Sequence, residues 1–299
     1  MTKETERFLQ YLRLELNHSR LTVDSYRRDL ELLEDFLATG ERPLDVASVT
    51  TSDVRACLVQ RSAQGDSPRT LRRRVQALRA FYKFLMRHGL ATDNPAADVE
   101  LARIPRRLPH TMRPQNMDAL LDDKVDMTDF TAVRDRLMVM MLYDTGMRRA
   151  ELIGLLDHNV DTDRGELKVH GKRDKDRIIP FGSELGQWIE RYRQLRDMTA
   201  GAVDAFFVTA SGRPVYPSLV YQVVHNALAT VGGAGQYSPH VLRHTFASAM
   251  LADGAGLNSV KELLGHESLA ATQVYTHVTL SELKHNYKLA HPRAIKKGG

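Results

Sequence analysis

S-P-H-V-L-R-H-T-F-A-S, residues 238–248, places two histidines and an arginine at the start of an expected helix. His240, Arg243 and His244 are spaced i, i+3 and i+4, so they share one face of that helix. The serine and proline that precede them are typical of an N-cap and a first helical residue. The first turn of a helix presents free backbone N–H groups and the positive end of the dipole, and both favour an anion. The sequence therefore predicts an anion-binding site at His240 and Arg243.

More polar groups follow this helix. His266 comes directly after Gly265, a residue type that commonly ends a helix, and Tyr275 lies nine residues further on. Arginine, imidazole and phenol, with no carboxylate pair and no cysteine, suit a phosphate ester better than an acyl group. Each residue alone is more often structural, so His266 is also readable as a helix cap and Tyr275 as a packing residue. The working hypothesis is a tyrosine that attacks a DNA phosphate.

Length and charge favour a two-domain protein that binds a polyanion. The chain has 299 residues, a formal net charge of +5 and an isoelectric point of about 9.3. Residues 1–110 hold 19 Lys and Arg against 15 Asp and Glu, whereas residues 111–299 hold 23 against 22. Most of the positive excess therefore lies in the N-terminal third, as expected for contact with nucleic acid.

Several classes of protein are disfavoured. The single cysteine, Cys57, excludes an intramolecular disulfide and a thiolate metal cluster, and its apolar surroundings predict burial. The charged N-terminus does not resemble a signal peptide, and the longest apolar run, Leu137 to Tyr143, is too short to cross a bilayer. We expect a cytoplasmic protein without membrane insertion.

Hydrophobic periodicity predicts a mainly α fold in two parts. Residues 1–102 contain four amphipathic helical patterns, the second of them starting at a cap on Thr22. Residues 103–113 are rich in Pro and Arg and predict a stiff basic linker. Residues 114–299 are mostly helical, with a small antiparallel sheet expected from the alternation in residues 166–170 and the returning run at 177–180.

Basic residues of the N-terminal part are candidates for DNA contact. Arg69, Arg72 and Arg73 crowd the first turns of the fourth helix, and Arg106 and Arg107 lie in the linker. A basic run on a helix is often only a solvated face. The charge of this third of the chain nevertheless favours contact with DNA phosphates, which position a protein without reading sequence.

The motifs together resemble the tyrosine recombinase family. The carrying stretches are T-G-M-R-R-A-E-L at 145–152, G-K at 171–172, H-V-L-R-H at 240–244, L-G-H at 264–266 and Y-T-H at 275–277. They occur in the family's order and at similar spacing. T-V-D-S-Y-R-R-D-L at 22–30 extends the resemblance to the N-terminal part, which implies a SAM-like core-binding domain. A-H-P-R-A at 290–294 resembles the Xer branch of bacterial chromosome-dimer-resolving recombinases.

The resemblance implies a role for each residue. Tyr275 would be the nucleophile that forms a 3′-phosphotyrosyl bond, and Arg148 and Arg243 would hold the non-bridging phosphate oxygens. His240 would exchange a proton with the tyrosine, and Lys172 would protonate the leaving 5′ oxygen. The same comparison makes His266 a hydrogen-bond donor to the phosphate and Glu151 a supporting residue.

The chemistry of the residues agrees with these roles. Charge grows on the phosphate in the transition state, and planar guanidiniums match its oxygens. A phenol with a pKa of about 10 needs a base or a cationic setting, and the alkoxide leaving group needs an acid. No step requires a metal, ATP or another cofactor. Taken separately, Arg148 and Glu151 would be only a surface ion pair worth little, and Lys172 a solubilising residue on a hairpin.

One position departs from the family pattern. Arg173 follows Gly171-Lys172 where the family commonly has a glycine, and a turn that needs positive φ would disfavour arginine. Lys175 is therefore an alternative acid, although Lys172 is preferred.

The expected function is site-specific recombination by cutting and rejoining DNA through a Holliday junction, with chromosome dimers as the substrate. The expected partners are a double-stranded recombination site, further subunits forming a homo- or hetero-tetramer with a related recombinase, and a septal DNA translocase. Alternatives are a mobile-element integrase, a type IB topoisomerase-like enzyme and a non-catalytic DNA-binding protein. The amphipathic stretch at 281–292 predicts a tail that docks into a neighbouring subunit, or a helix packed on its own domain.

Overall fold

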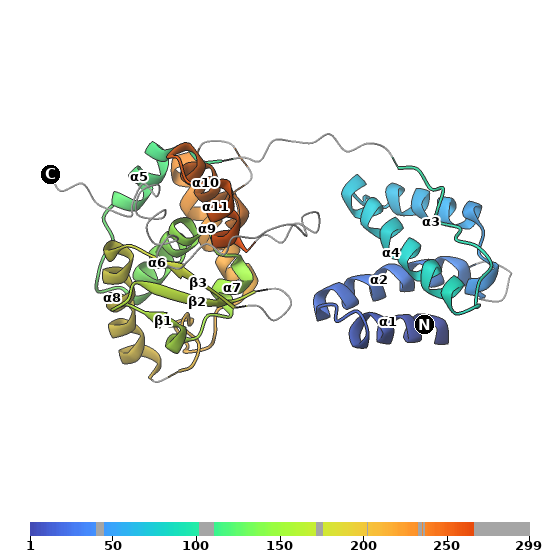
Figure 1. The fold of residues 1–299 in the computed structure, drawn as a ribbon, viewed down its shortest axis with the longest axis horizontal. Helices are drawn as coiled ribbons and strands as arrows, with labels where there is room; N and C mark the ends of the chain where they lie inside the picture. The colour runs from blue at the N-terminus through green and yellow to red at the C-terminus, as the bar shows by residue number, and fades with distance from the viewer. Residues whose placement is uncertain are drawn as a thin grey trace. The chain divides into compact units, whose positions relative to one another are not determined.

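The chain forms two compact units, Met1–Arg107 and Leu108–Gly299. A computed structural model describes residues 1–39, 45–101, 111–171, 176–201, 203–232, 235 and 237–265 (Figure 1). Each of the two units has its own hydrophobic core.

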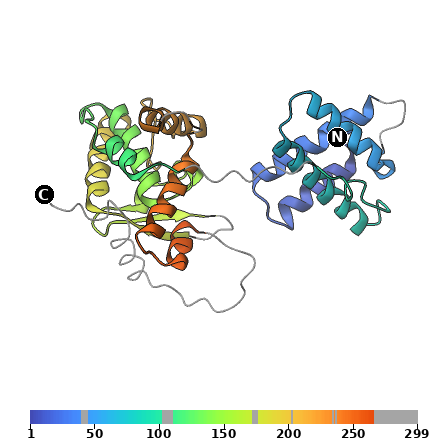
Figure 2. The ribbon, with the colours of Figure 1, turned by 90° about the horizontal axis from the view of Figure 1, so that it is seen from above.

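The N-terminal unit contains the four expected helices (Figures 1 and 2). They are α1 (Lys3–Leu14), α2 (Arg20–Ala38), α3 (Thr51–Ala63) and α4 (Pro68–Arg87), with a short 3₁₀ turn at Val46–Ser48. The prediction that Thr22 caps α2 is wrong, because Ser19 is the N-cap and its Oγ accepts a hydrogen bond from the Thr22 backbone N–H at 3.3 Å. The first turn of α2 was missed because Leu21 is exposed and the buried residues of the helix start only at Val23. The hydrophobic periodicity therefore indicates a later start than the real one.

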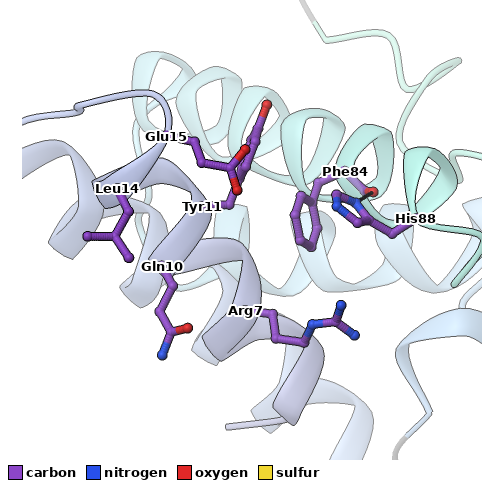
Figure 3. A pocket seen from close by; sticks show the side chains of 7 residues that line it. All are labelled: Arg7, Gln10, Tyr11, Leu14, Glu15, Phe84 and His88. Carbon is purple, nitrogen blue, oxygen red and sulfur yellow. Dashed lines mark hydrogen bonds between the residues drawn. The ribbon is translucent and has the colours of Figure 1, made fainter.

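The core of this unit is built from aromatic and aliphatic side chains of all four helices. Phe8 of α1 and Phe81 of α4 pack edge to face with ring centroids 5.4 Å apart. The Tyr82 hydroxyl donates to the Val46 carbonyl at 3.0 Å and so ties the 3₁₀ turn to α4. A shallow hollow between α1 and α4 is lined in part by Arg7, Tyr11, Phe84 and His88 (Figure 3). None of the predicted site residues lines it.

The C-terminal unit is built around one central helix, α6, and a small sheet. Its helices are α5 (Pro114–Asp122), α6 (Phe130–Thr145), α7 (Arg149–Ile153), α8 (Ser183–Ala200), α9 (Pro217–Gly232), α10 (Pro239–Ala252) and α11 (Leu257–Leu264). The antiparallel sheet has the order β1 (Val160–Asp161), β2 (Glu166–His170), β3 (Asp176–Pro180), and Leu167 pairs with Ile179. The hairpin strands were predicted. The two-residue strand β1 was not, since it is too short to show a period.

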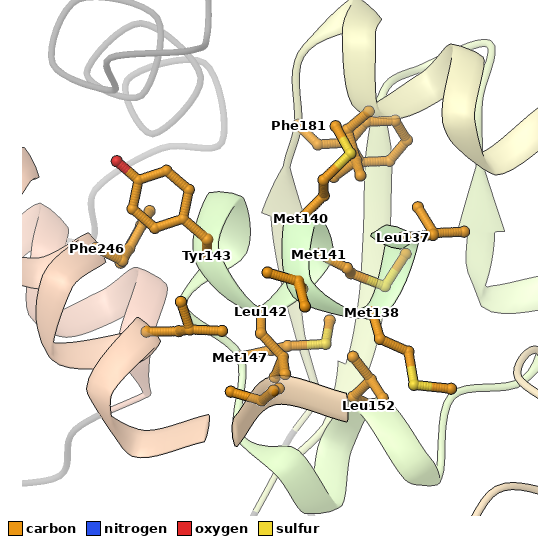
Figure 4. Packing of buried hydrophobic residues seen from close by; sticks show 14 of the residues in the cluster. Leu137, Met138, Met140, Met141, Leu142, Tyr143, Met147, Leu152, Phe181 and Phe246 are labelled. Carbon is orange, nitrogen blue, oxygen red and sulfur yellow. The ribbon is translucent and has the colours of Figure 1, made fainter. Parts of the chain in front are cut away.

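Helix α6 is buried on all sides from Leu137 to Thr145 and fixes the positions of its neighbours. Every residue from Leu137 to Tyr143 is at most 1% exposed, and the helix packs against α8, α9 and α10 (Figure 4). Such a uniformly apolar pattern is typical of a helix at the centre of a core. Within the described ranges, no helix combines the length and apolar character that a bilayer span requires.

Candidate active site

The end of α6 sets the geometry of the site. Gly146 ends the helix in the left-handed region, with φ 60°. A Cβ atom there would lie 2.4 Å from Cδ1 of Phe246 and 2.9 Å from Cδ2 of Leu264, so a side chain is excluded by both conformation and space. The predicted helix break is confirmed, and the tight turn places Arg148 at the N-cap of α7.

Arg148 is held by a carboxylate of its own helix. Its backbone N–H donates to Oε2 of Glu151 at 2.7 Å, and its Nη1 donates to Oε1 at 2.8 Å. The Glu151 side chain is only 4% exposed. Interpreting this pair as a surface ion pair of little consequence is therefore wrong, because the acidic partner is buried.

Sequence reasoning missed Arg177, which lies on β3 and binds the same carboxylate. Its Nη1 and Nη2 donate to Oε1 and Oε2 of Glu151, each at 2.8 Å, in the two-pronged geometry that suits guanidinium and carboxylate. Burial alone would raise the pKa of Glu151. The hydrogen bonds and charge of Arg177, together with the bonds from Arg148, overcome this effect and lower that pKa to about 2. Glu151 is therefore an anion shared by two arginines.

Three arginines meet at the C-terminal end of α11. The Leu263 carbonyl accepts from Nε of Arg177 at 2.8 Å, the Leu264 carbonyl from Nη2 of Arg243 at 2.6 Å, and the Gly265 carbonyl from Nη2 of Arg148 at 2.8 Å. Carbonyls at a helix C-terminus have no partners within the helix and carry the negative end of its dipole, so cations stabilise them. Gly265 ends the helix with φ 63°, which confirms the predicted stop.

Among the predicted cations that the structure describes, Arg243 is the most deeply buried. It is buried on α10, and its Nη1 donates to the Gly146 carbonyl at 2.6 Å. Burial, together with the nearby charges of Arg148 and Arg177 and against the opposing charge of Glu151, lowers the pKa of this guanidinium to about 10. The group remains charged at neutral pH. A guanidinium has five N–H donors. Arg148 and Arg243 each use two of theirs in the hydrogen bonds named above, so further donors can bind an anion.

His240 lies one turn before Arg243 on α10 and keeps part of its surface open to solvent. Partial burial of its ring, and then the neighbouring His244 and Arg149, lower the pKa of His240. A neutral imidazole is thereby favoured at neutral pH, as a proton acceptor requires. Ser238 is the N-cap of α10, as predicted, although its side chain makes no capping hydrogen bond.

Other predicted residues lie outside the described part of the chain. They are Lys172 with its alternative Lys175, His266, Tyr275, and the linker residues Arg106 and Arg107. Their roles stay predictions, as does that of the tail at 281–292. In sequence, Lys172 falls between the paired residues His170 and Asp176.

The basic run of α4 divides into two sets. Arg69 and Arg72 are exposed, and DNA contact by them stays a prediction. Arg73 donates to buried Asp29 through Nη2 at 2.8 Å, and Arg74 donates to the same carboxylate through Nη1 at 2.7 Å. These two arginines join α4 to α2; the Arg73 side chain is 41% exposed, and its contact with DNA also stays a prediction. In the described residues, no group of three or more His, Cys, Asp or Glu is placed to hold a metal ion.

Both units of the chain match known protein domains. Residues 110–282 match the phage integrase family and residues 5–89 match the phage integrase N-terminal SAM-like domain, so the chain belongs to the phage integrase family. The predicted resemblance to tyrosine recombinases is confirmed.

Within this family the chain is similar to proteins named XerC. Tyrosine recombinase XerC of Mycobacterium sp. (strain JLS) is 40% identical over 98% of this chain and 100% of the relative. XerC of Alcanivorax borkumensis is 37% identical over 97% and 94%, respectively. Among solved structures, XerH bound to a palindromic difH substrate has a TM-score of 0.69 at 20% identity, over 95% of this chain and 83% of that chain. A lambda integrase tetramer bound to a Holliday junction has a TM-score of 0.67 at 15% identity, over 91% and 79%. These two structures share the fold.

Proposed function

We propose that this protein is a site-specific tyrosine recombinase that resolves chromosome dimers by cutting and rejoining DNA. The observation that carries the proposal is the convergence of Arg148 and Arg243 on two successive carbonyls, those of Gly265 and Leu264. These two residues belong to the L-G-H motif, and the Y-T-H motif follows in the sequence. Two guanidiniums in one place suit a phosphodiester whose charge grows during reaction. The similarity to XerC proteins over nearly the full length supports the same function.

In the proposed reaction the phenol oxygen of Tyr275 attacks the scissile phosphorus. His240 takes the phenol proton, the bond from phosphorus to the 5′ oxygen breaks, and Lys172 gives that oxygen a proton. Arg148 and Arg243 neutralise the non-bridging oxygens, and His266 donates a further hydrogen bond. The energy of the phosphodiester is kept in the 3′-phosphotyrosyl bond, so the reverse attack by a 5′ hydroxyl of another strand completes the exchange without ATP.

The partners follow from the same proposal. Residues 1–102 would contact core DNA, the basic linker 103–113 would cross its backbone, and residues 114–299 would carry the chemistry and the docking tail. The lambda integrase tetramer on a Holliday junction, which shares this fold, is the basis for proposing four subunits, either identical or from two related recombinases. A DNA substrate of this kind implies action in the cytoplasm, with a septal DNA translocase as a regulator.

A nicked duplex tests this function. A nick close to the cleavage point lets the short 5′-hydroxyl fragment diffuse away, so the covalent intermediate accumulates. The wild-type chain should form a protein–DNA adduct that survives SDS, and Tyr275→Phe should form none while still binding the duplex. A mobile-element integrase would form the same adduct, so bound fragments should also be selected from the host genome. Recovery of a single chromosomal locus near the replication terminus supports dimer resolution, and recovery of element ends opposes it.

A further inference from the structure

Arg177 is a largely buried cation that the proposed chemistry does not use. Its side chain is only 13% exposed, and all three of its nitrogen atoms donate hydrogen bonds. Two of these bonds go to Glu151 of α7 and the third goes to the Leu263 carbonyl of α11. The protein thus engages three of the five N–H donors of Arg177, one on each nitrogen. Its effect on the reaction is therefore expected through the groups that it binds.

Those groups belong to the segments that hold the proposed catalytic residues. Glu151 holds Arg148, and Leu263 stands next to Leu264, whose carbonyl binds Arg243. β3 itself returns from the connection that contains Lys172. Arg177 therefore joins three elements that are distant in sequence, since its bonds to Glu151 and Leu263 span 26 and 86 residues.

The shared carboxylate also links the two arginines electrostatically. Glu151 divides its negative charge between Arg148 and Arg177, with contacts of 2.8 Å to each guanidinium. If Arg177 were neutral, the whole charge of Glu151 would act on Arg148 and hold that guanidinium more tightly to the protein. Less of its positive charge would then be available to a phosphate.

We propose that Arg177 is a positioning residue for phosphoryl transfer: it shares Glu151 with Arg148 and anchors the end of α11 to β3. The proposal rests on the proposed function. Lysine is a poor replacement, because a single ammonium cannot make the two-pronged bond to Glu151 and reach Leu263 at the same time.

The test compares Arg177→Gln and Arg177→Lys with a matched control, Arg193→Gln. Arg193 lies in the same unit and has a side chain 19% exposed. Like Arg177, it donates to carboxylate and carbonyl oxygens, with the carboxylates of Asp157 and Glu190 each at 3.1 Å and the Val160 carbonyl at 2.8 Å. It touches none of the proposed site residues. Single-turnover cleavage of the nicked duplex is measured at saturating DNA and below the melting temperature of each variant.

We expect Arg177→Gln to slow cleavage by about tenfold to a hundredfold, as small misplacements of reacting groups do, while the Kd for DNA changes less than about threefold. Arg193→Gln should stay within about twofold of the wild type. Arg177→Lys, which keeps the charge opposite Glu151, should recover only part of the rate and serves in place of Arg177→Gln if that variant does not fold.

A second substrate separates positioning from general damage to the fold. A methylphosphonate at the scissile position removes the negative charge that Arg148 is proposed to neutralise, so the defect of the Arg177 variants should shrink to about threefold or less. A defect of equal size on both substrates, or a rate within about twofold of the wild type, would overturn the proposal. Failure of the wild-type chain to form an adduct would instead overturn the proposed function.

Discussion

Glu151→Gln is the substitution whose effect the geometry defines most closely. Glutamine has nearly the size of glutamate and keeps one acceptor oxygen, but it replaces the other with an NH₂ group that faces arginine donors. The change leaves Arg177, whose side chain is 13% exposed, without its anionic partner. The expected result is a large loss of stability in the C-terminal unit together with a loss of cleavage.

The magnitude follows from the pKa of the carboxyl group. The protein lowers this pKa from an ordinary value of 4.5 to about 2. At about 1.4 kcal/mol per pKa unit, the ionised carboxylate contributes about 3 kcal/mol to the free energy of unfolding. Loss of one partner of a buried ion pair costs a similar amount, about 3–5 kcal/mol. For a unit of this size, about 3 kcal/mol corresponds to a fall in Tm of about 6–12 °C.

The dependence on pH has a definite sign. The pKa of Glu151 is lower in the folded state than in the unfolded state, so its contribution is complete above pH 4.5 and is lost as pH falls toward about 2. Urea unfolding of the full chain, followed by circular dichroism, should therefore show a difference between wild type and variant of about 3 kcal/mol at pH 7. That difference should shrink between about pH 4.5 and pH 2.

A carboxylate at the surface is the control. Glu190 pairs with Arg193 at 3.1 Å but its side chain is 51% exposed, so Glu190→Gln should change the free energy of unfolding by less than about 1 kcal/mol. If Glu151→Gln also changed the free energy of unfolding by less than about 1 kcal/mol at pH 7, the reasoning would be refuted. A large difference that persists unchanged down to pH 2 would refute it as well.

Four further predictions concern the turn, the proton transfers and the tail. Gly146→Ala should destabilise the chain by at least about 2 kcal/mol in urea titrations, because φ is positive and Phe246 occupies the space of the new methyl group. The pKa of His240 is lowered, so the acid limb of the cleavage rate should fall below pH 6.5, and His240→Gln should abolish that limb. A 5′-bridging phosphorothiolate, whose leaving group needs no proton, should restore cleavage by Lys172→Ala; rescue of Lys175→Ala alone would reassign the acid. Deletion of residues after Ser281 should abolish synapsis and spare binding to a single duplex in mobility-shift assays, whereas intact synapsis would refute docking by the tail.

Local patterns in the sequence predicted the parts of the site that depend on local structure. Helical spacing placed His240 and Arg243 on one face of α10, and the glycines at 146 and 265 marked the two turns that bring Arg148 and Arg243 to the end of α11. These features need only a few neighbouring residues. The small sheet was predicted for the same reason, from alternation within each strand.

The missed features depend on contacts between distant residues. Arg177 precedes two isoleucines near an expected turn, a position that normally predicts a solvated side chain. It is largely covered because the end of α11 packs against β3. Asp29 likewise has its partner Arg73 44 residues away on α4. Periodicity within one element carries no information about which element covers it, so the residues that join elements could not be identified in advance.

The central claim is that one phenol, Tyr275, becomes covalently joined to the scissile phosphate. Mass spectrometry of a protease digest of the SDS-resistant adduct, after nuclease trimming, measures this directly. We predict a modified peptide that contains Tyr275, with the nucleotide attached through its 3′ phosphate. Attachment at another residue, or through a 5′ phosphate, would contradict the proposed mechanism.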